Sequence, residues 1–235
     1  MRKQVGLDFL IPLSILSCLT MVFWFTNADI AFEKLFYSPE KGWFLEKSNP
    51  WNFLYRYGNI PALILAIVSI YLLAVSFLSQ KVLPYRKIAL FLVLFLLISP
   101  GLITYCVLKD NWGRPRPRHI ENFGGQEKFL PVWVKGVSGK GASFPSGHAS
   151  IGYFLISPFF FLRRRAKRGA AFFLFVGISY GTLMGIGRMV QGAHFPSDVL
   201  WSGGFIYLTG ITLYYLFQFD KDIWWRKKPI ETKGY

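Results

Sequence analysis

Six apolar blocks separated by short polar segments run along the chain. A helix needs about 20 mainly apolar residues to cross the hydrocarbon core of a bilayer, which is about 30 Å thick. The blocks cover, to within a few residues, 7–26, 60–79, 88–108, 149–162, 170–186 and 199–219. The fourth block is short and would need a turn from the loop before it, and Pro100 and Pro158 are expected to kink the third and the fourth. The pattern predicts an all-α polytopic membrane protein, a bundle of six transmembrane helices in which residues 1–235 form a single domain.

Basic residues are concentrated in alternate connections between the blocks. These connections are residues 2–3, 81–87, 163–168 and the tail 226–228. Loops rich in Lys and Arg stay in the cytoplasm under the positive-inside rule. We therefore expect both termini in the cytoplasm and the segments 27–59, 109–148 and 187–198 on the opposite side of the membrane.

Composition agrees with a bilayer environment. The chain is 53% hydrophobic and only 17% charged, whereas soluble domains average about 45–50% apolar and about 25% charged residues. The net charge of +15 suits nucleic acid, an anionic membrane surface or an anionic substrate. The long apolar blocks argue against nucleic acid. Cys18 and Cys106 each lie inside an apolar block, so we expect buried apolar residues rather than a disulfide.

Four cations lie where the topology rule does not expect them, at the start of the segment 109–148. They are Lys109, Arg114, Arg116 and Arg118. Lys and Arg at the ends of a span often only extend their charged groups to the membrane–water interface, and this alternative stays open. The planar guanidinium fork of arginine matches phosphate oxygens in pairs, however, and the number of cations on this side favours an anionic ligand. Arg114 and Arg118 have two open roles: assisting the phosphate site or contacting a second acidic group of the substrate.

A second polar stretch lies at the expected start of the fourth span and contains Ser146, Gly147 and His148. A helix start offers free N–H groups and a partial positive charge, which suits a phosphate. Ser146 adds a hydroxyl donor, and Gly147 lets a ligand approach the backbone. The alternative is a plain helix cap followed by a chance histidine, although the chain has only 3 histidines.

A third polar stretch connects the fifth and sixth spans. Arg188 ends one span, Asp198 begins the next, and His194 lies between them. A carboxylate that accepts the N–H of a histidine fixes its tautomer and makes the other nitrogen a better nucleophile. If the helix already includes the residues before Asp198, the two side chains stack on one face. The alternative is a capped helix start in which Asp198 complements the helix dipole.

Together the three stretches resemble the signature of the type 2 phosphatidic acid phosphatase (PAP2) superfamily. In that signature, Lys is followed after six residues by Arg-Pro, then comes Pro-Ser-Gly-His, and then Ser-Arg, five residues, His, three residues and Asp. The matching positions are Lys109, Arg116-Pro117, Pro145-Ser146-Gly147-His148, Arg188, His194 and Asp198. Gly187 stands where the family usually has serine. That serine is the member least tied to the chemistry, so activity is still expected.

The resemblance implies six transmembrane helices and a non-cytoplasmic active site. It implies that His194 attacks phosphorus to form a phosphohistidine, that Asp198 orients His194, and that His148 protonates the leaving oxygen and later activates water. The phosphate-binding groups would be Lys109, Arg116, Ser146, the Gly147 N–H and Arg188. The sequence has no metal-ligand cluster, so we expect a metal-independent reaction without a cofactor. The expected partners are a lipid phosphate and membrane lipids, with no nucleic acid and no required protein partner.

Shorter matches are similar to bacterial lipid A phosphatases, above all the 4′-phosphatase group. They include the context of residues 109–117, Phe123-Gly124-Gly125, and the early Asp29-Ile30 with Phe36-Tyr37. This implies a periplasm-facing site in the inner membrane. Other substrates stay open: undecaprenyl pyrophosphate, phosphatidylglycerol phosphate or phosphatidic acid, as does transfer of the phosphate to another lipid. A non-enzymatic anion transporter or lipid-binding protein would leave the spacing of His148, His194 and Asp198 unexplained.

Overall fold

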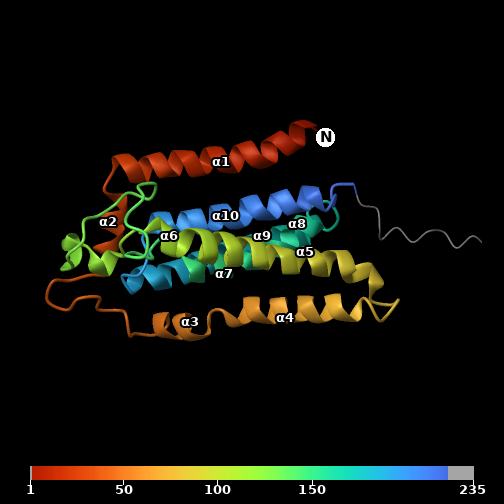
Figure 1. Ribbon diagram of the computed structural model, residues 1–235, viewed down its shortest axis with the longest axis horizontal. Coiled ribbons are helices and arrows are strands. Elements are labelled where there is room, and N and C mark those ends of the chain that lie inside the picture. The colour runs from red at the N-terminus through yellow and green to blue at the C-terminus, as the bar shows by residue number, and fades with distance from the viewer. Residues whose placement is uncertain (1, 222–235) are drawn as a thin grey trace, which may run out of the picture.

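The apolar blocks of the sequence form long helices that lie roughly side by side in an elongated bundle (Figure 1). The computed structural model describes residues 2–221, so the basic tail 226–228 lies outside the described part. The long helices are α1 (Arg2–Phe25), α4 (Ile60–Val75), α5 (Arg86–Leu96) with its continuation η2 (Leu97–Lys109), α9 (Lys167–Val190) and α10 (Pro196–Leu216). The shorter ones are α2 (Ala28–Glu33), α3 (Trp51–Tyr57), η1 (Leu83–Tyr85), α6 (Asp110–Trp112), η3 (Pro117–His119), η4 (Glu121–Phe123), α7 (Gly147–Tyr153), η5 (Phe154–Ile156) and α8 (Ser157–Leu162). The predicted all-α class is confirmed.

Five of the predicted spans are long and apolar enough to cross a membrane. They lie within Gln4–Phe25, Trp51–Val75, Leu83–His119, Lys167–Val190 and Pro196–Leu216. The predicted fourth span is the shorter stretch Gly147–Leu162, which does begin before the apolar block, in the loop that carries the histidine motif. It consists of α7, one 3₁₀ turn and α8. The structure therefore supports five candidate spans, and the sixth stays a prediction.

The two prolines that were expected to kink helices, Pro100 and Pro158, both coincide with a change of helix type. Pro100 lies in η2, where the backbone is π-helical, and Pro158 is the second residue of α8, just after the 3₁₀ turn η5. Proline lacks the N–H that continues an α-helical ladder, so a local change of hydrogen-bond pattern is the expected accommodation.

The centre of the bundle is formed by α7–α8, α9 and α10, and small residues allow their close packing. A Cβ atom at Gly181 would lie 2.2 Å from the Tyr153 ring, and one at Gly177 would lie 2.5 Å from the Ile156 nitrogen. Small residues at helix contacts let backbones approach closely in membrane proteins. The peripheral helix α1 is largely exposed; Cys18 on it and Cys106 on η2 are exposed as well. The prediction that both cysteines are buried was therefore wrong, because apolar positions of a spanning helix can face lipid.

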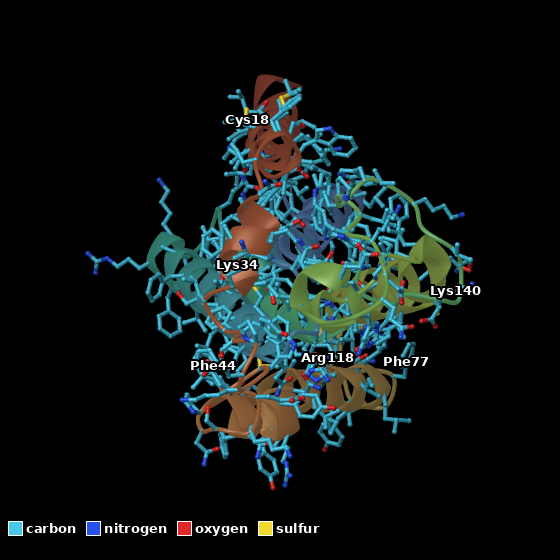
Figure 2. All side chains as sticks on the ribbon, turned by 90° about the vertical axis from the view of Figure 1, so that its left-hand side faces the viewer. Cys18, Lys34, Phe44, Phe77, Arg118 and Lys140 are labelled. Atoms are coloured by element: carbon cyan, nitrogen blue, oxygen red, sulfur yellow. The ribbon has the colours of Figure 1, made fainter. Side chains whose placement is uncertain are left out.

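The connections between helices gather at the two ends of the bundle (Figure 1). One end carries α2, α3, the long loop after α6 and the α9–α10 turn, whereas the N-terminus and the α4–α5 and α8–α9 connections lie at the other. Figure 2 looks onto the first end, with α1 protruding at the top of the view and α3–α4 at the bottom. Within the described residues, the segments expected on one side of the membrane thus share one end of the bundle, and all three motif stretches lie at that end. The side of the membrane to which each end belongs stays a prediction.

Candidate active site

His194 lies in the turn between α9 and α10 and is almost completely buried, with 1% of its surface exposed. Its Nδ1 atom is 2.5 Å from the main-chain carbonyl oxygen of Ser143 and 3.8 Å from Oδ2 of Asp198. Both neighbours are acceptors, so Nδ1 carries the proton and donates it to Ser143. The other ring nitrogen, Nε2, then keeps its lone pair, which is the form a nucleophilic histidine needs.

Asp198 contacts the loop that carries His148 as well as the histidine turn. Its Oδ2 accepts hydrogen bonds from the Ser143 hydroxyl at 2.6 Å and from the Phe195 N–H at 2.8 Å. Helix α10 begins at Pro196, so His194 precedes the helix and the expected stacking on a helical face does not occur. Asp198 therefore caps α10 and also holds Ser143, whose carbonyl oxygen accepts the hydrogen bond from His194, so the two interpretations of this carboxylate are compatible.

The surroundings keep His194 neutral. Burial of the ring lowers the pKa of His194 to about 3, and the neighbouring Asp198 offsets only part of this effect. A neutral imidazole in a buried site is able to attack an electrophile without first losing a proton. The geometry thus provides a neutral imidazole with a fixed tautomer, which is what the predicted role of nucleophile requires.

His148 is the second residue of α7 and is half-buried. Its ring stacks on Tyr55 with centroids 5.3 Å apart, and Arg188 lies over the same tyrosine ring with its Cζ atom 4.7 Å from the centroid. The charges of Lys109 and Arg188 act on both His148 and His194. Two histidines from different segments therefore share the same cationic neighbours, which is the arrangement expected around one bound phosphate.

The start of α7 is shaped for close approach of a ligand or side chain. Ser146 is its N-cap residue and accepts from the Ala149 N–H at 3.5 Å, while the Ser146 N–H donates to Ser202 of α10 at 2.9 Å. A Cβ atom at Gly147 would lie only 2.4 Å from the Tyr105 hydroxyl. Glycine is therefore required at this position, and Tyr105 is an additional polar group beside the predicted phosphate site.

A pocket of about 240 Å³ includes Tyr55, the residue that stacks on His148, but neither histidine lines it. Its lining combines three predicted site residues with residues of the 27–59 segment and of the α9–α10 turn: Glu46, Lys47, Asn52, Tyr55, Arg116, Arg118, Arg188 and Gln191. Arg118 pairs with Glu46 at 3.1 Å and also donates to the main chain of Gln191. It lies near the middle of the end face in Figure 2. Four cationic side chains thus line the pocket: Lys47, Arg116, Arg118 and Arg188.

Arg114 occupies a different place, although it is only two residues from Arg116. It is fully buried, and its guanidinium donates to Asp198 at 2.5 Å, to Asp29 at 2.8 Å and to the Leu130 carbonyl oxygen at 2.9 Å. These contacts place Arg114 in the protein interior, next to Asp198. They do not favour the interpretation that Arg114 contacts the substrate.

A comparison with protein families shows to which family the chain belongs. The profile of the PAP2 superfamily matches residues 87–222, which include all three motif stretches. The chain belongs to the PAP2 superfamily. It is accordingly a multi-pass membrane phosphatase, and the resemblance inferred from the motifs is confirmed.

Curated relatives of this PAP2 protein are bacterial. The chain is similar to the lipid A 4′-phosphatase of Francisella tularensis subsp. novicida (strain U112), with 35% identity over 201 residues, 84% of this chain and 90% of the relative. It is also similar to the lipid A 4′-phosphatase of Rhizobium leguminosarum, with 34% identity over 106 residues, 45% of this chain and 44% of the relative. No solved structure matches the chain.

Several polar residues of this PAP2 site were not predicted from the sequence. Asp29 and Tyr55 lie before the part that matches the family profile, in a segment for which the sequence predicted no site residue. Ser143 precedes the histidine motif and contacts both His194 and Asp198. A carboxylate just after a span, as at Asp29, is the one sequence signal that could have drawn attention to this segment.

The described residues hold no group of three or more His, Cys, Asp or Glu side chains placed to bind a metal ion. The metal-independent reaction stays a prediction, to be tested by activity in the presence of a chelator.

Proposed function

We propose that this protein removes a phosphate from lipid A at the periplasmic face of the bacterial inner membrane, through a phosphohistidine on His194. The observation that carries this proposal is the meeting of the three distant motif stretches at one end of the bundle. The charges of Lys109 and Arg188 act on both histidines there, and three arginines line a pocket together with Tyr55, which stacks on His148. The relatives named lipid A 4′-phosphatase support the choice of lipid and favour the 4′ position. The sequence match to the first of them extends well beyond the motifs.

In the proposed first step, Nε2 of His194 attacks phosphorus while the bond to the leaving oxygen breaks and His148 supplies that oxygen with a proton. His194 keeps its Nδ1 proton, so the phosphorylated ring is cationic. Ser143 accepts the Nδ1–H, and Asp198 places a negative charge 3.8 Å away. Negative charge next to a developing cation stabilises the transition state most where water is excluded.

In the second step, His148 has lost its proton and takes one from a water molecule that attacks the phosphorus. The P–N bond breaks, inorganic phosphate leaves, and His194 returns to its neutral form. Lys109, Arg116, Arg188, Ser146 and the Gly147 N–H hold the phosphoryl oxygens in both steps. Phosphoryl transfer depends mainly on this type of positioning and charge stabilisation.

The proposed topology has six spans, with Gly147–Leu162 as the sixth, both termini in the cytoplasm and the pocket on the periplasmic side. The arrangement of the loops supports it, because the predicted periplasmic segments lie at one end of the bundle (Figure 1). Arg163, Arg164 and Arg165 follow α8 at the other end. Cations flanking a short helix are able to anchor it at the interface.

The test is phosphate release by purified protein in detergent from a panel of lipid A, undecaprenyl pyrophosphate, phosphatidylglycerol phosphate and phosphatidic acid. We expect preference for lipid A, loss of its 4′-phosphate, and no release by His194→Ala. A clear preference for an isoprenoid diphosphate would refute the lipid A assignment. Retained activity of His194→Ala would refute the nucleophile. Adding an acceptor lipid separates hydrolysis from transfer, because transfer depletes free phosphate without slowing substrate consumption.

A further inference from the structure

Asp29 is a buried carboxylate of the short helix α2 and lies close to Asp198, the carboxylate next to His194. It is 1% exposed. Its Oδ2 accepts from Arg114 at 2.8 Å and from the Ser197 hydroxyl at 2.6 Å, and its Oδ1 accepts from the Ser197 N–H at 3.0 Å. Asp29 thus contacts the first turn of α10, in which Asp198 lies. Residues 87–222, matched by the family profile, do not include it.

Arg114 links this carboxylate to Asp198. One terminal nitrogen of its guanidinium donates to Asp198 and to Ser197, and the other donates to Asp29. The rigid, planar fork fixes the two carboxylates relative to each other. A displacement of Asp29 would therefore move Arg114 and, with it, the carboxylate next to His194.

We propose that Asp29 is a positioning residue for the phosphatase reaction, which acts through Arg114 to fix Asp198 and to leave it a net negative charge. This inference rests on the proposed function in one respect: it takes His194 as the nucleophile.

The charges of Asp29, Asp198 and Arg114 explain how Asp29 would affect the reaction. Two buried carboxylates, Asp29 and Asp198, share the single guanidinium of Arg114. The three groups therefore carry one excess negative charge behind His194. Without Asp29, Arg114 would neutralise Asp198 alone, and the cationic phosphohistidine would lose its counter-charge. Electrostatic interactions are strong in a site from which water is excluded.

Anchoring of α2 does not require the carboxylate. Ile30, the next residue, is buried in an apolar cluster with Ile120, Phe123 and Phe195. The same short helix also offers a matched control. Glu33 lies one turn further on, is fully buried, and has neither carboxylate oxygen hydrogen-bonded within the described part of the chain. Asp29 and Glu33 thus share the helix and the burial, and only Asp29 contacts the guanidinium.

The experiment compares Asp29→Asn with Glu33→Gln and wild type in detergent, using the lipid phosphate that wild type hydrolyses best. We expect Asp29→Asn to lower kcat by about 10- to 100-fold, the size of effect that misplacement of a catalytic group produces, with KM changed by less than about threefold. Glu33→Gln should stay within about twofold of wild type for kcat. The reaction is stopped in alkali at short times, because phosphohistidine survives alkali, to measure the rate and the amplitude of phosphoenzyme formation.

The amplitude separates positioning from simple loss of folded protein. A structural defect lowers the amplitude at an unchanged observed rate, because fewer molecules react and each reacts normally, whereas a positioning defect changes the observed rate of phosphoenzyme formation itself. The double variant Asp29→Asn/Arg114→Gln should be no slower than Arg114→Gln alone, since both changes break one chain of contacts. Wild-type rates in Asp29→Asn, a loss of amplitude alone, or additive losses in the double variant would overturn the inference. Failure of wild type to form a phosphoenzyme would instead refute the proposed function.

Discussion

Two arginine–aspartate clusters fasten the first helices of the chain to the rest of the bundle, one at each end. At the site end, Arg114 joins Asp29 to Asp198, and these side chains are at most 2% exposed. At the opposite end, Arg163 at the end of α8 pairs with Asp8 of α1 at 2.6 Å, with side chains 15% and 13% exposed. The Asp8 carboxylate also accepts from Tyr215 of α10 at 2.5 Å.

The two clusters use the same side chains for different purposes. Arg163 neutralises one carboxylate, and the pair adds only a link between α1 and the end of α8. Arg114 is shared by two carboxylates and lies next to His194, so the excess negative charge is at the point where positive charge develops during the proposed reaction. The comparison indicates that the number of acids per arginine and the neighbouring histidine, rather than the ion pair itself, distinguish a functional cluster from a structural one.

The largest expected effect is that of Arg114→Gln. This change leaves Asp29 and Asp198 buried without their cation, which typically costs about 3–5 kcal/mol of unfolding free energy. Phosphate release should fall by at least about 100-fold, since Asp198 loses its fixed position. Unfolding in mixed detergent micelles and steady-state phosphate release measure both quantities.

Arg116→Gln is the control for this prediction, because Arg116 lies only two residues away and lines the pocket. It should lose activity while its unfolding free energy stays within about 1 kcal/mol of wild type. Equal stability losses in the two variants would contradict the distinction between the buried and the pocket arginine.

The second effect is that of Asp8→Asn at the other end of the bundle. Loss of the charged hydrogen bonds from Arg163 and Tyr215 should lower the unfolding free energy by about 1–3 kcal/mol. The kcat of the folded protein should stay within about twofold of wild type, because no catalytic group contacts this cluster. A fall in kcat as large as that of Asp29→Asn would remove the functional difference between the two ends.

Much of this architecture follows from the sequence, and the reasons for the exceptions are physical. Apolar length predicts six spans, of which five are long and apolar enough in the described structure. The spacing of Lys109, His148 and His194 predicts which residues meet, because each lies at a span end on the same side. The roles of Arg114 and Arg116 could not be separated, since two arginines so close in sequence have the same chemistry until folding buries one of them. Asp29 was missed because its partner Arg114 lies 85 residues away in the sequence.

A third effect concerns the ionisation of His194, a group that has no counterpart in the Arg163 cluster. Burial lowers the pKa of His194 to about 3 from its ordinary 6.5, so its ring should stay neutral between about pH 5 and pH 8. Nitrogen chemical shifts of isotope-labelled histidine in micelles, assigned with His194→Ala, measure this directly. With 3 histidines in the chain, the signals are separable. A titration midpoint of the His194 signal near its ordinary pKa would contradict a dry, neutral nucleophile.

The smallest effect, and the most specific to the site end, is that of Glu33→Gln. Burial, reinforced by the charges of Asp29 and Asp198, raises the pKa of Glu33 well above its usual 4.5. Above that usual value the unfolded chain has released this proton while the folded protein still holds it, so the folded state becomes less stable as pH rises towards the raised pKa. Glu33→Gln removes this titration. The melting temperature of the variant should therefore rise relative to wild type between about pH 5 and pH 8, with kcat nearly unchanged. A pH-independent difference in melting temperature between Glu33→Gln and wild type would show that Glu33 is ionised in the folded protein. The net charge next to His194 would then be more negative than the one excess charge of Asp29, Asp198 and Arg114.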